Sequence, residues 1–243
     1  MTIYCLHLKK IPVYEQLLIE EKLIRADHRN YFIINHDSPE AIVMGISSNA
    51  NELIDLKKTE EKKIPIIRRY SGGGTVIIEK KTLLTSFILD KHLFPHLSFP
   101  EPLLKWSGDF YSKALKIKNF QIKEQDYALN DRKCAGNAQY ITKDRLVHHT
   151  SFLWDYSQEL MDLLHHPKKA PIYREKRSHK DFLSPLHPYF SCKMSMIHSL
   201  IEELKNFWEV VMINEDDLQE ILEKKVRIST HFYEKNPSSG LHS

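Results

Sequence analysis

Cysteine is scarce in this chain of 243 residues, which carries it only at Cys5, Cys134 and Cys192. None of the three belongs to a CxxC pair, and so sparse and odd a set indicates a reducing compartment rather than a disulfide framework. The N-terminus lacks the basic flank and the long apolar run of a signal peptide. We therefore expect a cytoplasmic protein.

Long apolar runs and a strong charge of one sign are missing as well. No stretch approaches the roughly 18 apolar residues that a membrane helix needs, so no membrane span is expected. The 35 basic and 32 acidic residues leave a net charge of +3, which is too small to indicate a nucleic-acid partner. Hydrophobic residues make up 42% and charged residues 28% of the chain, and this ordinary balance predicts a globular protein with a full core.

The spacing of apolar residues predicts strands that run together, with helices inserted in blocks. Residues 31–34 and 41–44 are apolar runs separated by Asp37, Ser38 and Pro39, which predicts a hairpin. Further strands are expected at 3–8, 64–67, 74–78 and 84–89 and within 120–154, and helices after Pro12 and Pro102, around 200–208 and after Asn214. The expected fold class is α+β, with a mixed, largely antiparallel β-sheet flanked by helices.

Glycine is scarce too, but three of the chain's seven glycines are consecutive, at positions 72, 73 and 74. Without side chains there, the backbone N–H groups are open to a bulky anionic ligand; the alternative is a flexible turn between two strands. Arg68 and Arg69 precede this segment. Because successive side chains of a strand face opposite sides, at most one of them faces the ligand, and we favour Arg69.

The glycines match neither of two common phosphate-binding motifs. A Walker A loop requires a lysine and a hydroxyl residue directly after its last glycine, and this segment has no such lysine. The dinucleotide fingerprint requires a glycine that opens a helix, whereas residues 75–78 form a β-type run. An anion bound here would therefore be held by a strand–turn–strand.

A second segment rich in small and polar residues begins at Lys133 and ends at Gln139. Lys133 is either a solvated surface lysine or a point charge that pairs first with a carboxylate and then with a phosphoryl oxygen. Because small residues follow it, a ligand could approach closely. A positive charge at such a place suits a reaction in which negative charge migrates.

Several other side chains have two interpretations each. Cys134 should point away from Lys133 and be buried, or else form a thioester as a nucleophile. Alternation turns one of two adjacent histidines inward, and we favour His149 as a hydrogen-bonding residue of the site. Asp126 could face a nucleotide-bound Mg²⁺ or be an ordinary surface carboxylate. The basic run 173–180 is either a solvated loop or a docking site for an acidic partner.

These segments resemble those of the biotin/lipoate ligase superfamily, and most closely lipoate–protein ligase A in a compact, plant-type form. The matching stretches are IRRYSGGGTV (67–76), NDRKCAGNAQ (130–139) and HHTSFLWDY (148–156), with 170–174 and 178–183 as a fourth. The resemblance implies that residues 1–190 form a ligase-like catalytic domain and that 191–243 form a helical extension packed on it. It also implies a mixed sheet with the ligand in a tunnel above it.

The resemblance implies a reaction as well. Lipoate and Mg·ATP would give lipoyl-adenylate, and the lipoyl group would pass to a lysine of a lipoyl carrier domain, either a 2-oxoacid dehydrogenase E2 subunit or the glycine cleavage H protein. Lys133 would be the catalytic residue. The implied ATP-binding residues are Arg69, Ser71, Gly72, Gly73, Gly74, Thr75, Val76, Ile77 and Lys133; the implied lipoate-binding residues are Arg69, Gly73, Lys133, Gly136, Asn137, Ala138 and His149; and Asp126 would face Mg²⁺.

Two departures from the family pattern leave alternatives open. Residues 79–82 read Glu-Lys-Lys-Thr where many members carry a His-Asp…Gly-Asn stretch, and residues 191–243 are fewer than the sizeable C-terminal accessory domain of many ligases. We therefore expect that these final residues form a reduced cap, or that a separate accessory subunit is required. Two other functions stay possible: an ATP-independent octanoyl or lipoyl transferase that uses a cysteine thioester, and a non-catalytic module that binds lipoate or its adenylate.

Overall fold

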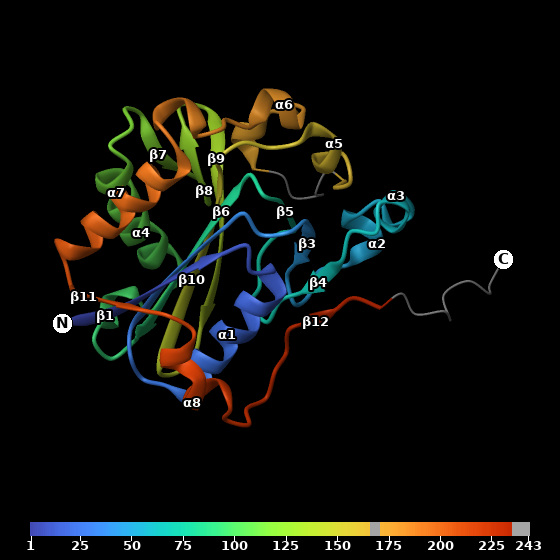
Figure 1. Ribbon diagram of the computed structural model, residues 1–243. Coiled ribbons are helices and arrows are strands. Elements are labelled where there is room, and N and C mark those ends of the chain that lie inside the picture. The colour runs from blue at the N-terminus through green and yellow to red at the C-terminus, as the bar shows by residue number, and fades with distance from the viewer. Residues whose placement is uncertain (166–170, 235–243) are drawn as a thin grey trace.

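The computed structural model describes residues 1–165 and 171–234, and a large mixed β-sheet forms its centre (Figure 1). Its eight strands lie in the order β11 (Glu209–Ile213), β1 (Thr2–Lys9), β2 (Tyr31–His36), β6 (Thr82–Asp90), β10 (Arg145–Leu153), β9 (Arg132–Ile141), β8 (Asp126–Leu129) and β7 (Phe120–Lys123). β1 is parallel to both of its neighbours, and the other neighbouring strands are antiparallel. With its flanking helices, this sheet confirms the predicted α+β fold class.

A second, smaller sheet consists of β12 (His231–Phe232), β4 (Ile66–Arg68), β3 (Ala41–Met44) and β5 (Val76–Ile78), in that order. The predicted hairpin between residues 31–34 and 41–44 is therefore wrong, because β2 and β3 belong to different sheets. All six residues of β2 are buried. A strand that is covered on both faces takes an interior place between two partners, which here are β1 and β6.

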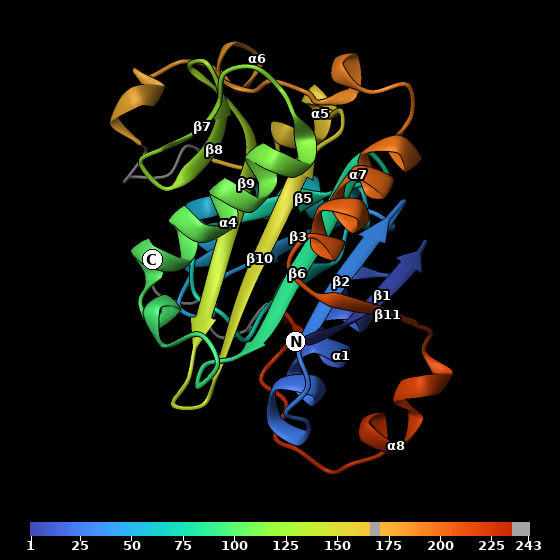
Figure 2. The same ribbon diagram turned by 90° about the vertical axis from the view of Figure 1, so that its left-hand side faces the viewer.

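Helices and the small sheet cover the two faces of the large sheet. The helices are α1 (Val13–Ala26), α2 (Ala50–Leu53), α3 (Leu56–Glu61), α4 (Pro100–Leu115), α5 (Gln158–Met161), α6 (His179–Phe182), α7 (Lys193–Lys205) and α8 (Gln219–Leu222), with 3-10 turns at Pro95–Leu97, Ile172–Arg174, His187–Tyr189 and Asp216–Leu218. Figure 2 shows α4 and α7 side by side across one face, where they enclose a core around Phe87 and Leu200. The opposite face packs against α1 and the small sheet around Leu17 and Ile33.

Helix α1 buries charge together with its apolar stripe. Pro12 precedes its first turn, and Val13 and Leu17 lie on its buried side at helical spacing. Glu20 and Glu21 are fully buried as well. A buried carboxylate is tolerated only where donors surround it, so both glutamates must have partners on other elements.

The C-terminal part of the chain returns to the main body at several points. α7 packs on α4, and β11 pairs with β1. The helix predicted after Asn214 is shorter than expected, because it consists of one 3-10 turn and the four residues of α8. The predicted frayed tail at 236–240 lies outside the described residues, and the domain boundary at residue 190 stays a prediction.

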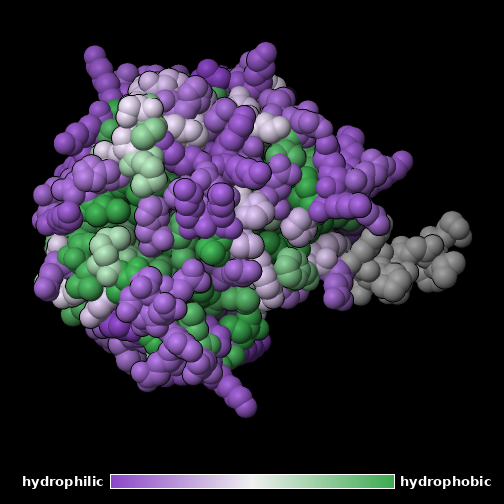
Figure 3. Space-filling model, viewed as in Figure 1, coloured by the Kyte–Doolittle hydropathy of each residue, from purple (hydrophilic) through white to green (hydrophobic). Residues whose placement is uncertain are grey.

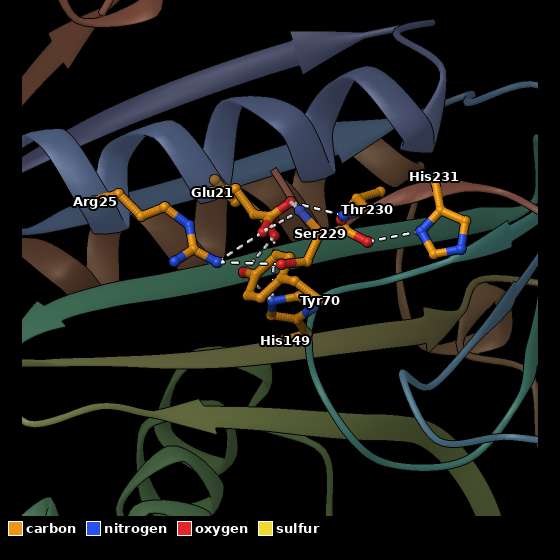
Figure 4. Close-up of polar contacts among 8 residues, drawn as sticks. Glu21, Arg25, Tyr70, His149, Ser229, Thr230 and His231 are labelled. Atoms are coloured by element: carbon orange, nitrogen blue, oxygen red, sulfur yellow. Dashed lines mark hydrogen bonds and ion pairs between the residues drawn. The ribbon is translucent and has the colours of Figure 1, made fainter. Parts of the chain in front are cut away.

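A segment beyond α8 runs beside α1 and leads to β12 (Figure 1). Glu21 accepts the backbone N–H groups of Ser229 at 2.9 Å and Thr230 at 2.9 Å, and it pairs with Arg25 at 3.0 Å (Figure 4). β12 then adds to the edge of the small sheet beside β4. One buried carboxylate therefore joins a segment near the C-terminus to a helix near the N-terminus.

Among the residues that the structure describes, no helix is long and apolar enough to cross a membrane. In the view of Figure 3, hydrophobic residues gather toward the middle and lower part of the face, and hydrophilic residues surround them.

Replacing Glu21 tests the role of this buried carboxylate. Glu21→Ala leaves two backbone donors without their acceptor, and we expect the free energy of unfolding to fall by about 2–4 kcal/mol. The matched control is Glu15→Ala, which removes an exposed glutamate from the same helix and should cost about 0.5 kcal/mol or less. Urea titration followed by circular dichroism measures both, and equal effects of the two variants would contradict the assignment.

Candidate functional site

A cavity of about 1160 Å³ lies where α1, both sheets and the segment 171–183 meet. Its lining brings together all but one of the site residues predicted from the sequence: Arg69, Gly72, Gly73, Gly74, Thr75, Val76, Ile77, Asp126, Lys133, Gly136, Asn137, Ala138 and His149. Ser71 is the exception, because it is fully buried and its hydroxyl accepts a hydrogen bond from Arg69 Nε at 2.9 Å. A smaller hollow of about 540 Å³ beside Arg68 and β12 contains none of the predicted site residues.

Arg69 shapes the glycine loop from within. Its guanidinium donates to the carbonyl oxygens of Gly72 at 2.6 Å and Gly74 at 3.0 Å. Burial lowers the pKa of this guanidinium to about 10, which leaves it charged at neutral pH. Because the loop carbonyls turn toward Arg69, the guanidinium holds the loop in one conformation. Arg68 points elsewhere and donates to backbone oxygens between Gly45 and Ser48.

Two glycines in contact fix the position of this loop. A Cβ atom added at Gly45 would lie 2.4 Å from the carbonyl oxygen of Gly73, far closer than atoms can approach. Gly73 itself has a φ of +98°, in the region that favours glycine. A Cβ at Gly72 or Gly74, in contrast, would meet nothing within 4 Å. The loop is therefore pressed against Gly45 on one side and open on the other.

Lys133 belongs to a small polar cluster on the cavity wall. Its ammonium group lies 2.7 Å from Asp126 Oδ1, and Tyr173 donates its hydroxyl to Asp126 Oδ2 at 3.0 Å. The Lys133 side chain is 27% exposed, so it is held in place and still accessible to a ligand. Burial, with Asp126 nearby, raises the pKa of the Tyr173 hydroxyl, which therefore stays protonated as a donor.

Cys134 points into the core on the other side of strand β9. It is fully buried, and its Sγ lies 3.4 Å from the carbonyl oxygen of Tyr127. Burial raises the pKa of the thiol to about 12, so a thiolate is not available at neutral pH. Cys192 is exposed at the start of α7 and does not line the cavity.

The buried end of the cavity is polar. His149 Nε2 lies 2.9 Å from the Tyr70 hydroxyl and 3.1 Å from Glu20 Oε2, and Tyr70 also donates to Glu20 at 3.1 Å. Gln16 and Ser86 donate to the other oxygen of Glu20 at 2.9 and 2.6 Å. Burial lowers the pKa of His149, although the Glu20 carboxylate opposes this effect.

Apolar side chains line the space between the glycine loop and this polar end. Leu17 of α1, Val43 of β3, Val76 and Ile78 of β5 and Leu84 of β6 face the cavity. They come from three different layers of the fold, so no single stretch of sequence contains the slot. The cavity can therefore hold a molecule with an apolar tail and an anionic group at one end.

Gln16, Glu20 and Arg174 are residues of the site that were not predicted from the sequence. Gln16 and Glu20 lie on the buried stripe of α1, three and seven residues after Val13, and polar residues at such positions are the available signal. The sequence places Arg174 in a basic run that either docks a partner or is solvated. It is instead 5% exposed and lines the cavity.

The segment that departs from the family pattern faces mostly away from the cavity. Glu79 is 5% exposed and accepts the backbone N–H of Ser157 at 2.8 Å, and burial raises the pKa of its carboxyl. Of residues 79–82, Thr82 alone lines the cavity. In the described part of the chain, no group of three or more His, Cys, Asp or Glu side chains could hold a metal, and the assignment of Asp126 to Mg²⁺ stays a prediction.

The fold and the cavity define a class of protein. An α+β scaffold presents an open glycine loop, an accessible lysine and an apolar slot to one cavity. Residues 12–206 match the family model of the lipoyl protein ligase A/B catalytic domain, so the chain belongs to this family. The match is to the A/B catalytic-domain family as a whole, and the compact plant-type subgroup stays a prediction.

The sequence relatives include one protein named an inactive ligase and another named a ligase. The inactive lipoate–protein ligase 2 of Plasmodium falciparum is 29% identical over 95% of this chain and 78% of its own length. The lipoate–protein ligase LplJ of Bacillus subtilis is 31% identical over 57% of this chain, and the match covers 42% of LplJ. The chain therefore spans less than half of the bacterial relative.

Solved structures share the fold. A lipoate–protein ligase A bound with ATP matches with a TM-score of 0.73 and 16% identity, covering 93% of this chain and 96% of that one. A Thermoplasma acidophilum protein with bound lipoic acid matches with a TM-score of 0.73 and 14% identity, covering 91% and 93%. The bi-partite ligase of the same organism, studied with its E2 lipoyl domain, has a TM-score of 0.72 and 17% identity, with 93% of both chains covered.

Two alanine variants test the contact between Gly45 and the glycine loop. Gly45→Ala forces a Cβ against the Gly73 carbonyl, and we expect the free energy of unfolding to fall by about 1–3 kcal/mol. Gly72→Ala adds the same atom where space is open and should change stability by about 0.5 kcal/mol or less. Denaturant titration compares them, and an unchanged stability of Gly45→Ala would show that the loop is free to shift.

Proposed function

We propose that the protein is an ATP-dependent lipoate–protein ligase. It would activate lipoate with Mg·ATP and transfer the lipoyl group to a lysine of a carrier domain. The observation that carries this proposal is the meeting of the glycine loop, the Lys133 cluster and the apolar slot in one cavity. A carboxylate cannot acylate an amine at neutral pH without activation, and such a cavity can align an acid with a nucleotide.

The glycine loop and Lys133 are suited to the first step. In that step the lipoate carboxylate attacks the α-phosphorus of ATP, and pyrophosphate leaves. The open sides of Gly72 and Gly74 allow phosphate oxygens to approach the main chain, and the buried hydroxyl of Thr75 has no hydrogen-bond partner among the described residues. Lys133 would neutralise the carboxylate and then the phosphoryl oxygen as charge moves between them. Asp126 would keep the ammonium group aimed at that point.

The second step requires an external amine. The ε-amine of the carrier lysine attacks the acyl carbon, a carbon–nitrogen bond forms, and AMP leaves with the bonding electron pair. The apolar slot would hold the lipoyl tail away from water. Partners would be E2 subunits or the H protein, as the archaeal neighbour with its E2 lipoyl domain suggests. Because that neighbour is bi-partite, a separate accessory subunit is part of the proposal.

One observation favours a second candidate. The chain is 29% identical over 95% of its length to a relative named an inactive ligase, and residues 79–82 depart from the pattern of many members. A module that binds lipoate or its adenylate without catalysing the transfer would retain the same cavity. Tight lipoate binding without transfer to any carrier domain would support this candidate over the ligase.

The ligase proposal is tested by weighing the product. The purified protein is incubated with lipoate and a lipoyl carrier domain, with and without Mg·ATP, and the carrier is analysed by mass spectrometry. We expect one lipoyl group to be added only when ATP is present. Lys133→Ala should slow this reaction about 10²–10³-fold, because it removes the charge that stabilises the transition state.

Lys143→Ala is the matched control for this measurement, because Lys143 is exposed in the turn between β9 and β10. It should react at the rate of the unmodified protein. Lipoylation of the carrier domain in the absence of nucleotide would contradict the ligase proposal. A full rate in Lys133→Ala would remove Lys133 from the chemistry.

The cysteine-thioester mechanism is tested separately. Because Cys134 is buried with a raised thiol pKa and lies on the far side of the strand from Lys133, Cys134→Ser should retain lipoylation activity within about threefold, apart from a modest loss of stability. Mass spectrometry of the carrier and of the protein itself provides the measurement. A covalent acyl group on Cys134, or complete loss of transfer in the serine variant with its fold intact, would favour the transferase.

A further inference from the structure

Two histidines outside the cavity lie side by side with unsatisfied nitrogen atoms. His7 of β1 and His36 of β2 have ring centres 5.2 Å apart. The Nε2 atoms of both are buried without a hydrogen-bond partner among the described residues. His36 is 3% exposed, and neither residue lines the cavity. Because a buried polar atom without a partner is costly, this pair suggests a ligand.

The register of the two strands explains why the rings meet. β1 and β2 are parallel, with His7 opposite Ile34 and Lys9 opposite His36. His36 is therefore two residues beyond the partner of His7, and residues two apart on a strand face the same side of the sheet. Figure 2 shows the two strands ending side by side near the start of α7.

Asp37, which directly follows β2, orients the ring of His36. Its Oδ2 lies 2.9 Å from His36 Nδ1, and its Oδ1 accepts from Lys193 Nζ at 2.6 Å. Because a carboxylate bonds only a protonated Nδ1, the Nε2 atom of the neutral ring carries a lone pair. A carboxylate on the far nitrogen is the usual partner of a histidine that binds a metal ion.

Both imidazoles are in the neutral form that a metal ion requires. Burial lowers the pKa of the His7 imidazole, and the nearby His36 and Lys9 lower it further. Burial also lowers the pKa of His36, although its hydrogen bond with Asp37 opposes this effect. Asp37 neutralises Lys193, and Lys9 is exposed, so solvent screens its charge from a cation held by the two rings.

The separation of the rings matches a tetrahedral metal ion. A zinc ion lies about 2.0–2.1 Å from an imidazole nitrogen and therefore about 3.2 Å from the ring centre. Two rings at the tetrahedral angle of about 109° would have centres about 5.2 Å apart, whereas the angle of about 90° in a square-planar copper site would bring them to about 4.5 Å. The distance of 5.2 Å between the ring centres fits the tetrahedral arrangement.

We propose that His7 and His36 form a zinc-binding site, with Asp37 as the residue that positions His36. The pair supplies two ligands, and water or an anion would complete the coordination, because no group of three His, Cys, Asp or Glu side chains is assembled in the described residues. A bound ion would join the ends of β1 and β2 and, through Asp37 and Lys193, the start of α7. The site is independent of the proposed ligase function.

Titration of the chelator-treated protein with Zn²⁺, followed by calorimetry, tests this site. Asp37→Asn leaves both ligands in place and should weaken Zn²⁺ binding about 10- to 100-fold, the usual cost of losing an orienting carboxylate. His36→Gln removes a ligand and should weaken binding by more than Asp37→Asn does. Mg²⁺ should not bind here, because it prefers oxygen ligands.

His92→Gln is the matched control, because His92 is an exposed histidine that also pairs with a carboxylate, 3.1 Å from Asp144 Oδ1. It should leave the affinity for Zn²⁺ unchanged. Two readouts need no buried substitution and therefore hold even if His36→Gln fails to fold. Of the 14 histidines in the chain, the imidazole NMR signals of His7 and His36 should shift with Zn²⁺, and Co²⁺ should give the intense visible absorption of a tetrahedral site.

Three results would overturn the zinc site. The first is equal Zn²⁺ affinity of the unmodified protein and the double variant His7→Gln/His36→Gln. The second is imidazole signals of His7 and His36 that do not respond to Zn²⁺, in which case a buried water satisfies the two nitrogen atoms. The third is an equal loss of affinity in His92→Gln, which would indicate ordinary surface binding. Lipoyl transfer to a carrier domain reports on the ligase alone, so the two proposals fail separately.

Discussion

Two adjacent buried carboxylates on α1 join several separate parts of this molecule. Glu20 accepts hydrogen bonds from Gln16, Ser86 and Tyr70, which belong to α1, the large sheet and the glycine-loop segment. Glu21 accepts from the backbone of Ser229 and Thr230. A buried charge is stable only when its donors stay in place. These two residues therefore hold the large sheet, the glycine-loop segment, the first helix and the C-terminal segment in one arrangement.

Two cations of the cavity, Arg69 and Lys133, have different roles. Arg69 is buried against the carbonyl oxygens of the glycine loop and stabilises the loop from within. Lys133 is accessible and held by Asp126. A preorganised loop and a fixed ammonium group need little rearrangement when charge develops, and this is the usual source of electrostatic catalysis. Contact of the loop with Gly45 adds a steric limit to the same rigidity.

Membership of the family establishes the scaffold and leaves the chemistry to the side chains. Relatives of this chain include a protein named inactive as well as one named a ligase, and the solved neighbours share its fold at 14–17% identity. The same scaffold therefore supports different outcomes. In this chain Lys133, Asp126 and the buried Arg174 all line the same cavity.

The sequence by itself determined the features that depend on neighbouring residues. Alternation along a strand separated Lys133 from Cys134, consecutive glycines marked the open loop, and apolar periodicity located α1 and α4. Tertiary structure alone decided the features that depend on distant partners. β2 paired with β1 and β6 in the large sheet, whereas β3 paired with β4 and β5 in the small one, and Glu20 gained its place from Tyr70 and Ser86, far along the chain. Local sequence carries backbone preference and periodicity, whereas the pairing of a buried charge exists only once the chain has folded.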